Sequence, residues 1–176
     1  MFIGFTSMLA VDLVQLGRTG SVIVEGEWSS DDELWQDLSF SWVGQLVARL
    51  RATYAGTGEV VVRGHSSGRL RQDCRRCLES VETSFKKELT MVFVSDPSGD
   101  ENDGGVHPLV PEGQTLELSK AVREEVILAV NPYVICDADC QGLCPQCGTN
   151  LNEDSCTCIE EANDPRWGPL QDLKSE

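Results

Sequence analysis

The stretch VETSFKKELTMVF, residues 81–93, alternates apolar and polar side chains along most of its length. Successive side chains of a β-strand point to opposite faces, so this alternation predicts a strand with one buried and one wet face. Lys87 interrupts the apolar side. Half-buried strands are typical of an antiparallel sheet that is covered on one face. The apolar side consists of Val81, Phe85, Leu89, Met91 and Phe93.

Earlier stretches extend the same pattern. Residues 42–54 alternate, and residues 55–58, AGTG, supply turn residues before a strand that starts at Val60. Together they predict a β-hairpin. Val22 to Val24 predict another short strand. The apolar side of the first hairpin strand is expected to be Trp42, Leu46, Ala48, Leu50, Ala52 and Tyr54, opposite Gln45, Arg49, Arg51 and Thr53.

Two helices are expected to cover this sheet. Ser30 can cap a helix over residues 31–38, with Glu33 completing a capping box. Ser119 can cap a second helix that ends near Val130. The apolar stripe of the second helix is Leu118, Val122, Val126 and Ala129. We therefore predict an α+β fold, in which a mainly antiparallel β-sheet domain is covered by one or two helices.

The composition divides the chain into regions. Residues 1–135 are expected to form the α+β domain, with a flexible acidic loop at residues 95–114, which are rich in Asp, Gly and Pro. Residues 136–158 are expected to form a cysteine-rich zinc-binding module. Residues 159–176 are expected to be a polar tail.

Six of the eight cysteines lie within residues 136–158, CDADCQGLCPQCGTNLNEDSCTC. Cys144 and Cys147 have the spacing of a zinc knuckle, in which a tight turn presents two thiolates to one ion. Gly148 allows the backbone to turn directly after the second ligand. Zinc is therefore the cofactor that the sequence predicts, because such a segment has little core of its own and metal binding would supply its folding energy.

The other six cysteines leave the ligand assignment open. They are Cys74, Cys77, Cys136, Cys140, Cys156 and Cys158. Either the pair before the knuckle or the pair after it could complete the site. Eight thiols also suffice for two zinc sites of four ligands each, with the second built on Cys74 and Cys77. Alternatively, Cys74 and Cys77 form a redox pair, because arginines such as the two between them lower the pKa of a thiol.

The sequence offers little for catalysis. Its two histidines, His65 and His107, lie outside the cysteine cluster. It contains no P-loop, no HExxH motif and no recognisable Ser-His-Asp set. We therefore expect a protein that is not an enzyme.

The chain is expected to act in the cytoplasm and away from membranes. It carries a formal net charge of -15 and has no apolar run long enough for a transmembrane helix. The start, MFIGFTSMLAV, lacks a positive region and is followed by Asp12, which argues against a signal peptide. Clustered CxxC spacing suits metal binding in a reducing compartment better than a disulfide framework.

Basic residues concentrate in one part of this acidic chain. Residues 49–87 hold nine basic and four acidic side chains. Arginine forks suit phosphates, so a strand–turn–strand unit would present a basic edge to folded RNA. The alternative is a solvated face whose arginines pair with the protein's own acidic groups. The candidate RNA-binding residues are Arg63, Arg69, Arg71, Arg75 and Arg76.

Several segments together resemble the YceD family of large-ribosomal-RNA accumulation proteins. They are residues 74–79, CRRCLE, residues 125–130, EVILAV, residues 136–158, and residues 164–167, DPRW. The resemblance implies a factor for the synthesis, processing or stability of large-subunit ribosomal RNA, with no known enzymatic activity. It implies ribosomal RNA or a pre-ribosomal large subunit as the partner.

Two other functions remain open at this stage. The first is a zinc-stapled adaptor that binds a basic ribosomal protein or a ribonuclease without touching RNA, since an acidic surface attracts basic partners. The second is a thiol-disulfide redox protein that uses Cys74 and Cys77. The sequence does not predict the oligomeric state.

Overall fold

The computed structural model describes residues 9–56, 58–95, 105–110 and 114–158. The predicted polar tail, residues 159–176, and most of the predicted loop, residues 95–114, lie outside the described residues.

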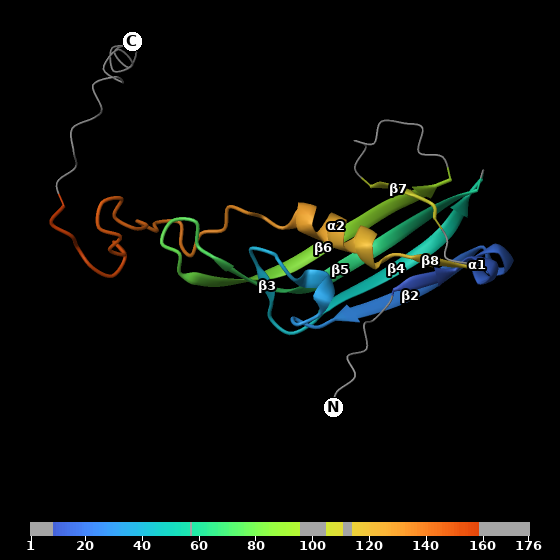
Figure 1. Cartoon of the computed structure of the whole chain (residues 1–176), viewed down its shortest axis with the longest axis horizontal. Coiled ribbons are helices and arrows are strands. Elements are labelled where there is room, and N and C mark those ends of the chain that lie inside the picture. Colours follow the sequence, from blue (N-terminus) through green and yellow to red (C-terminus); the bar gives the residue numbers. More distant parts are fainter. Residues whose placement is uncertain (1–8, 57, 96–104, 111–113, 159–176) are drawn as a thin grey trace, which may run out of the picture.

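One long sheet forms the centre of the molecule (Figure 1). Its strands are β2 (Ser21–Trp28), β4 (Leu46–Ala55), β5 (Glu59–Asp73), β6 (Ser80–Val94) and β7 (Val106–Pro108). They lie in the order β2-β4-β5-β6-β7, antiparallel except for the parallel pair β6 and β7. β3 (Ser41–Trp42) also pairs with β5. A separate ladder joins β1 (Ala10–Asp12) to β8 (Thr115–Glu117).

The strands that the alternation predicts are confirmed. The stretch at residues 81–93 lies in β6, and β4 and β5 form the predicted hairpin with Ala55 opposite Glu59. Lys87 is exposed, as its charge requires. The buried side of the two strands β4 and β6 consists of Leu46, Ala48, Leu50, Ala52, Phe85, Leu89, Met91 and Phe93.

Three details of the strand predictions were wrong. Trp42 does not continue β4 but lies in the separate strand β3, opposite Leu70 of β5. Tyr54, expected on the buried side, is 42% exposed because it lies at the end of β4, next to the turn. The predicted loop contains strand β7, which pairs with residues 92–94 of β6.

The predicted second helix is confirmed as α2 (Ser119–Ala129), but not with the predicted cap. Leu118 occupies the cap position and makes no side-chain cap hydrogen bond. The Ser119 hydroxyl instead accepts a hydrogen bond from the backbone N–H of Leu9, at 3.2 Å. The Glu117 carboxylate accepts the Ser119 N–H at 2.7 Å. Ser119 is therefore the first residue of α2 and joins it to the N-terminal segment, but it does not cap the helix.

The predicted helix over residues 31–38 was wrong. That segment forms only the short 3-10 turn η1 (Glu33–Trp35), with Asp32 as its cap. Tertiary packing explains the difference, because Trp35 is buried between two other tryptophans. Its ring meets those of Trp28 and Trp42 edge to face, with centroids 6.1 and 5.5 Å away.

A short helix, α1 (Leu13–Thr19), was not predicted. Asp12 caps it by accepting the N–H groups of Val14 and Gln15 at 2.8 and 2.9 Å. Gly20 ends it in the left-handed conformation, with φ of 73°. Seven residues are too few for a helical period to stand out in the sequence.

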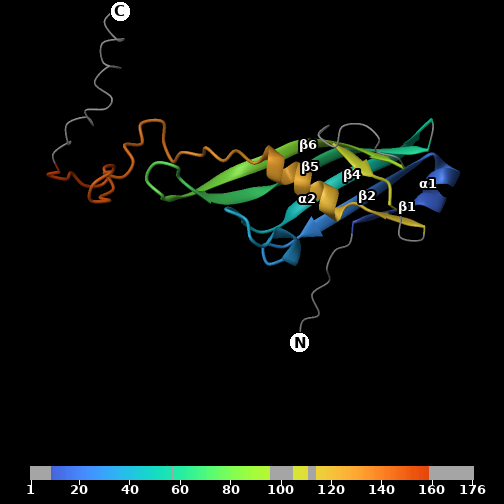
Figure 2. The same ribbon diagram turned by 45° about the horizontal axis from the view of Figure 1, so that its top comes forward.

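The helices leave one face of the sheet open. In Figures 1 and 2, α2 and η1 lie on the same side of the long strands, and no helix among the described residues covers the other side. The cysteine-rich segment extends beyond the far end of the β5–β6 hairpin. Neither helix within the described residues is long and apolar enough to cross a membrane.

Candidate metal centres

The turn between β5 and β6 is a cysteine knuckle. The backbone N–H of Cys74 donates to the Glu79 carbonyl at 2.7 Å, and the N–H of Leu78 donates back to the Cys74 carbonyl at 2.9 Å. Leu78 adopts the left-handed conformation, with φ of 61°. The N–H of Arg76 points at the Cys74 sulfur, 3.4 Å away. This turn places the Cys74 and Cys77 thiols on the same side of the hairpin tip.

A second knuckle, which begins at Cys144, has the same hydrogen-bond pattern. Its residues follow those of the first knuckle by 70 positions, so Cys144 corresponds to Cys74. The N–H of Cys144 donates to the Thr149 carbonyl at 2.8 Å, and the N–H of Gly148 donates to the Cys144 carbonyl at 2.9 Å. Gly148 has a φ of 75°, as the sequence predicts for the residue after the second ligand. Both CxxC pairs therefore sit on one type of turn.

The first knuckle and the pair that follows α2 come together as the first tetrad. Its members are Cys74, Cys77, Cys136 and Cys140, whose sulfurs all lie within 4.8 Å of one another. The Cys77 and Cys136 sulfurs are 3.5 Å apart, and those of Cys74 and Cys140 are 3.9 Å apart. Tetrahedral zinc with bonds of about 2.3 Å sets its sulfurs about 3.8 Å apart. The spacing therefore fits one metal ion.

The second knuckle and the pair that follows it form the second tetrad. Its members are Cys144, Cys147, Cys156 and Cys158, again with all sulfurs within 4.8 Å of one another. The sequence left open whether the preceding or the following pair completes this site. The fold separates them, because the preceding pair contacts the β5–β6 turn instead. Each tetrad could hold one metal ion, and all eight cysteines are used.

Hydrogen bonds support the sulfurs of the first tetrad from outside. The N–H of Cys136 donates to the Cys74 sulfur at 3.3 Å, and the Asn152 amide donates to the Cys140 sulfur at 3.4 Å. Arg76 donates from Nη1 to the Cys140 carbonyl at 2.8 Å. Such contacts orient ligands and help to hold thiolate charge. Asn152 lies in the segment of the second tetrad, so it links the two tetrads.

The environments of the thiols differ strongly within each tetrad. A hydrogen bond from the Cys77 backbone lowers the pKa of Cys74 to about 6. The Thr149 hydroxyl lowers the pKa of Cys147 to about 6. The neighbouring Cys140 thiol raises the pKa of Cys136 to about 12, and Cys147 does the same to Cys158. Four thiolates this close together would repel one another unless a cation lay between them. A set of four sulfur ligands of this kind therefore fits a soft divalent ion.

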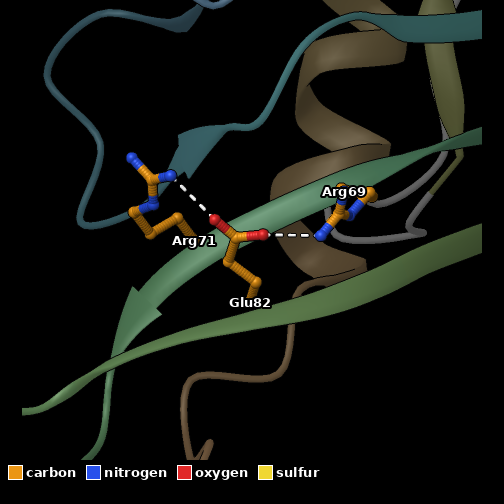
Figure 3. Close-up of polar contacts among 3 residues, drawn as sticks. All are labelled: Arg69, Arg71 and Glu82. Carbon is orange, nitrogen blue, oxygen red and sulfur yellow. Dashed lines mark hydrogen bonds and ion pairs between the residues drawn. The ribbon is translucent and has the colours of Figure 1, made fainter.

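The five candidate arginines do not form one uniform basic edge. Arg69 and Arg71 both bind Glu82 of β6, with distances of 2.6 and 2.7 Å (Figure 3). The hydrogen bond from Arg71 lowers the pKa of Glu82. These two arginines therefore form the intramolecular pairs that the sequence offered as the alternative. Arg63 has no ion pair with any described residue and lies on the open face of β5.

The other two candidates lie in the first knuckle. The guanidinium of Arg75 stacks over the Tyr133 ring, 4.2 Å from its centroid, and its backbone N–H donates to the Val134 carbonyl at 2.9 Å. Arg76 is committed to the Cys140 carbonyl. Both therefore help to attach the segment after α2 to the hairpin tip.

Comparison with known proteins gives the family. Residues 62–174 match the family model described as large ribosomal RNA subunit accumulation protein YceD. The chain belongs to the YceD family. The matched range includes both knuckles and both tetrads. The residues 164–167, which contributed to the resemblance, lie outside the described residues.

Relatives of this YceD-family chain occur in plants and mycobacteria. A chloroplast protein of Arabidopsis thaliana, named as a YCED homolog for large ribosomal RNA subunit accumulation, is 39% identical over 66 residues, which is 38% of this chain and 21% of the plant protein. An uncharacterised protein of Mycobacterium tuberculosis is 30% identical over 173 residues, covering 95% of this chain and 82% of that protein. The chain thus spans about a fifth of the plant relative. No solved structure matches.

Two functional features of this YceD-family chain escaped the sequence prediction. Asn152 contacts the first tetrad although it follows the second knuckle, and no local pattern signals that contact. The first knuckle has Leu78 where the second has glycine, so the usual turn signal is missing there. Only the CxxC spacing marks it in the sequence.

Proposed function

We propose that this YceD-family protein supports the accumulation of large-subunit ribosomal RNA by binding the RNA or a pre-ribosomal particle, without catalysis, and that each cysteine tetrad holds one zinc ion. The family match carries this proposal, because it covers both knuckles and names the RNA concerned. Zinc-binding thiolates require a reducing compartment, so the proposal places the protein in the cytoplasm.

Zinc has a structural role in the proposal. Four thiolates saturate a tetrahedral ion and leave no position for water, as in structural zinc sites. The first ion would tie the β5–β6 turn to the segment after α2, and the second would fold residues 144–158. The protein would thereby present a rigid extension beyond the sheet.

The first knuckle is the proposed RNA contact of this extension. Arg75 is exposed and held over Tyr133, so its charge has a defined place. A positioned guanidinium suits the phosphates of a folded RNA, which proteins recognise largely by shape and backbone. Arg76 is a poorer probe, because replacing it would also free the Cys140 carbonyl.

Complementation of cells that depend on this protein tests the proposal. Arg75→Glu is expected to weaken association with pre-ribosomal particles and to lower the ratio of large-subunit to small-subunit RNA. Arg18→Glu makes the same change of charge on α1, at the opposite end of the molecule, and is expected to behave as wild type. Normal particle association of the Arg75→Glu protein would remove the knuckle from the proposal, and a wild-type protein that never associates with such particles would refute the function.

A protein adaptor is the second candidate, favoured by the net charge of -15. An acidic surface attracts basic partners such as ribosomal proteins or ribonucleases. Crosslinking in cells separates the candidates, because RNA bound directly to this chain supports the first, and crosslinks to proteins alone support the second.

A further inference from the structure

The open face of the sheet carries two arginines directly opposite each other. Arg51 of β4 faces Arg63 of β5 in the register of the hairpin. Their outer neighbours in the same row are Ile23 of β2 and Thr90 of β6, so neither arginine has an acidic residue across from it. Like charges in directly opposed positions destabilise a sheet. The two arginines therefore lower the stability of the sheet, and no acidic residue in the same row compensates for their repulsion.

The other arginines of this face each have an acidic partner. Arg49 binds Glu25 at 3.1 Å, and Arg69 and Arg71 share Glu82. Among the described residues, the side chain of Arg51 hydrogen-bonds to the Ser21 hydroxyl at 3.4 Å, and this hydroxyl carries no charge. The two facing arginines therefore differ from the other arginines that the structure describes on this face, because neither has an acidic partner among the described residues.

The nearest acid on the β6 side does not change this result. Glu88 lies in the next row of the open face, opposite His65. The structure gives it no ion pair with Arg63 among the described residues. Two guanidinium groups therefore remain available to a ligand.

Both arginines line one surface depression. It has a volume of about 350 Å³ and is lined by Arg51, Thr53, Ala55, Val61 and Arg63. The Thr53 hydroxyl is its neutral polar group, donating to the Val61 carbonyl at 3.4 Å. The remaining lining is apolar. Two guanidinium groups beside a small, partly apolar depression are suited to a ligand that joins an anionic group to a less polar part.

We propose that the Arg51–Arg63 row is a phosphate-binding site that docks the sugar–phosphate backbone of RNA on the open face of the sheet. The inference rests on the proposed function and adds a contact surface distinct from the first knuckle. Charge complementarity selects the occupant: the chain as a whole, at -15, repels a polyanion, so attraction must come from charges that no acidic group neutralises. A strand face that no described helix covers is accessible for recognition of the RNA backbone by shape.

RNA binding by the full-length, zinc-loaded protein tests the site. The probe is a fluorescently labelled RNA hairpin, and its affinity is measured by anisotropy over a series of salt concentrations. The test variant is Arg51→Gln with Arg63→Gln. The control variant is Arg49→Gln with Arg69→Gln. It removes the same charge from the same two strands and the same face, but its two arginines already form ion pairs with Glu25 and Glu82.

The test variant is expected to bind the hairpin about ten-fold more weakly or worse, because a hydrogen bond between charged groups contributes roughly this factor. The slope of log affinity against log salt concentration should become less negative by roughly 1 to 2, since about one counterion is released for each phosphate neutralised. The control variant is expected to stay within about two-fold of wild type, because its arginines form surface ion pairs of small net effect.

Equal losses in both double variants, or no loss in the test variant, would overturn the site. Sedimentation of the same proteins with pre-ribosomal particles separates that failure from failure of the function. Wild-type association together with unchanged RNA binding of the test variant refutes the site and keeps the function. Wild-type protein that binds neither the hairpin nor the particles refutes both.

Discussion

At the scale of single residues, one leucine adopts a conformation that its side chain disfavours. Leu78 has a φ of 61° at the position that Gly148 occupies in the other knuckle. A left-handed conformation costs an L-residue with a Cβ about 1–2 kcal/mol, whereas glycine adopts it freely. Leu78 is 62% exposed, so its side chain contributes little burial in return.

Leu78→Gly is therefore expected to stabilise the protein. The gain should be about 0.5–1 kcal/mol, because the relief of strain exceeds the greater freedom of glycine in the unfolded chain. Urea unfolding at a fixed zinc concentration measures it. Gly148→Leu serves as the reciprocal control and should destabilise by a similar amount. A loss of stability in Leu78→Gly would show that its side chain makes an undetected favourable contact.

The facing arginines give a second prediction at this scale. Arg63→Gln should raise the free energy of unfolding by about 0.2–1 kcal/mol, because it removes a like-charge pair in directly opposed positions. Arg69→Gln breaks an ion pair with Glu82 and should leave stability unchanged or slightly lower. Thermal unfolding at low and high salt checks both, since salt should shrink the difference. If Arg63→Gln destabilises the protein, the like-charge argument fails.

At the scale of elements, the chain after α2 is attached to the hairpin tip by polar contacts. Gln72 of β5 donates to the Asn131 carbonyl at 3.2 Å, and the Arg75 N–H donates to the Val134 carbonyl. The first tetrad continues this attachment. A metal ion bound there would join two elements that are distant in sequence, while the sheet has an apolar core of its own.

Removal of metal should consequently loosen only one end of the molecule. After chelation under reducing conditions, amide hydrogen exchange is expected to accelerate in residues 131–158 and at the β5–β6 turn. The central parts of β4, β5 and β6 should keep their protection, because their buried side chains contact the helix-covered core rather than the tetrads. Uniform loss of protection would show that the sheet also depends on metal, and no change would show that the tetrads do not.

The elements also show what the sequence could supply. Alternation identified β4 and β6, since each has one buried and one wet face, and the turn residues before Val60 identified the start of β5. The apolar stripe identified α2. The failure at residues 31–38 has a physical cause: the burial of Trp35 against Trp28 and Trp42 outweighs a local capping box. Short elements such as α1 and β7 carry too few residues for a periodic signal.

At the scale of the whole molecule, the sequence singled out the cysteines of the candidate metal sites but left open how they group into two tetrads. The spacing of Cys144 and Cys147 was sufficient to predict a knuckle. The partners of Cys74 and Cys77 were not predictable, because Cys136 is 59 residues from Cys77 and only the fold brings them to 3.5 Å. The Arg51–Arg63 row could almost have been predicted from the sequence. The turn at residues 55–58 fixes the register of the hairpin, and this register sets Arg51 opposite Arg63.

Native mass spectrometry of the reduced, full-length protein directly counts the metal ions that each chain binds. Two zinc ions per chain are expected, with Cys144→Ser losing the second tetrad's ion while the first is retained. A reduced protein that carries no zinc, or a single ion whose binding requires cysteines from both tetrads, would contradict the two-site arrangement.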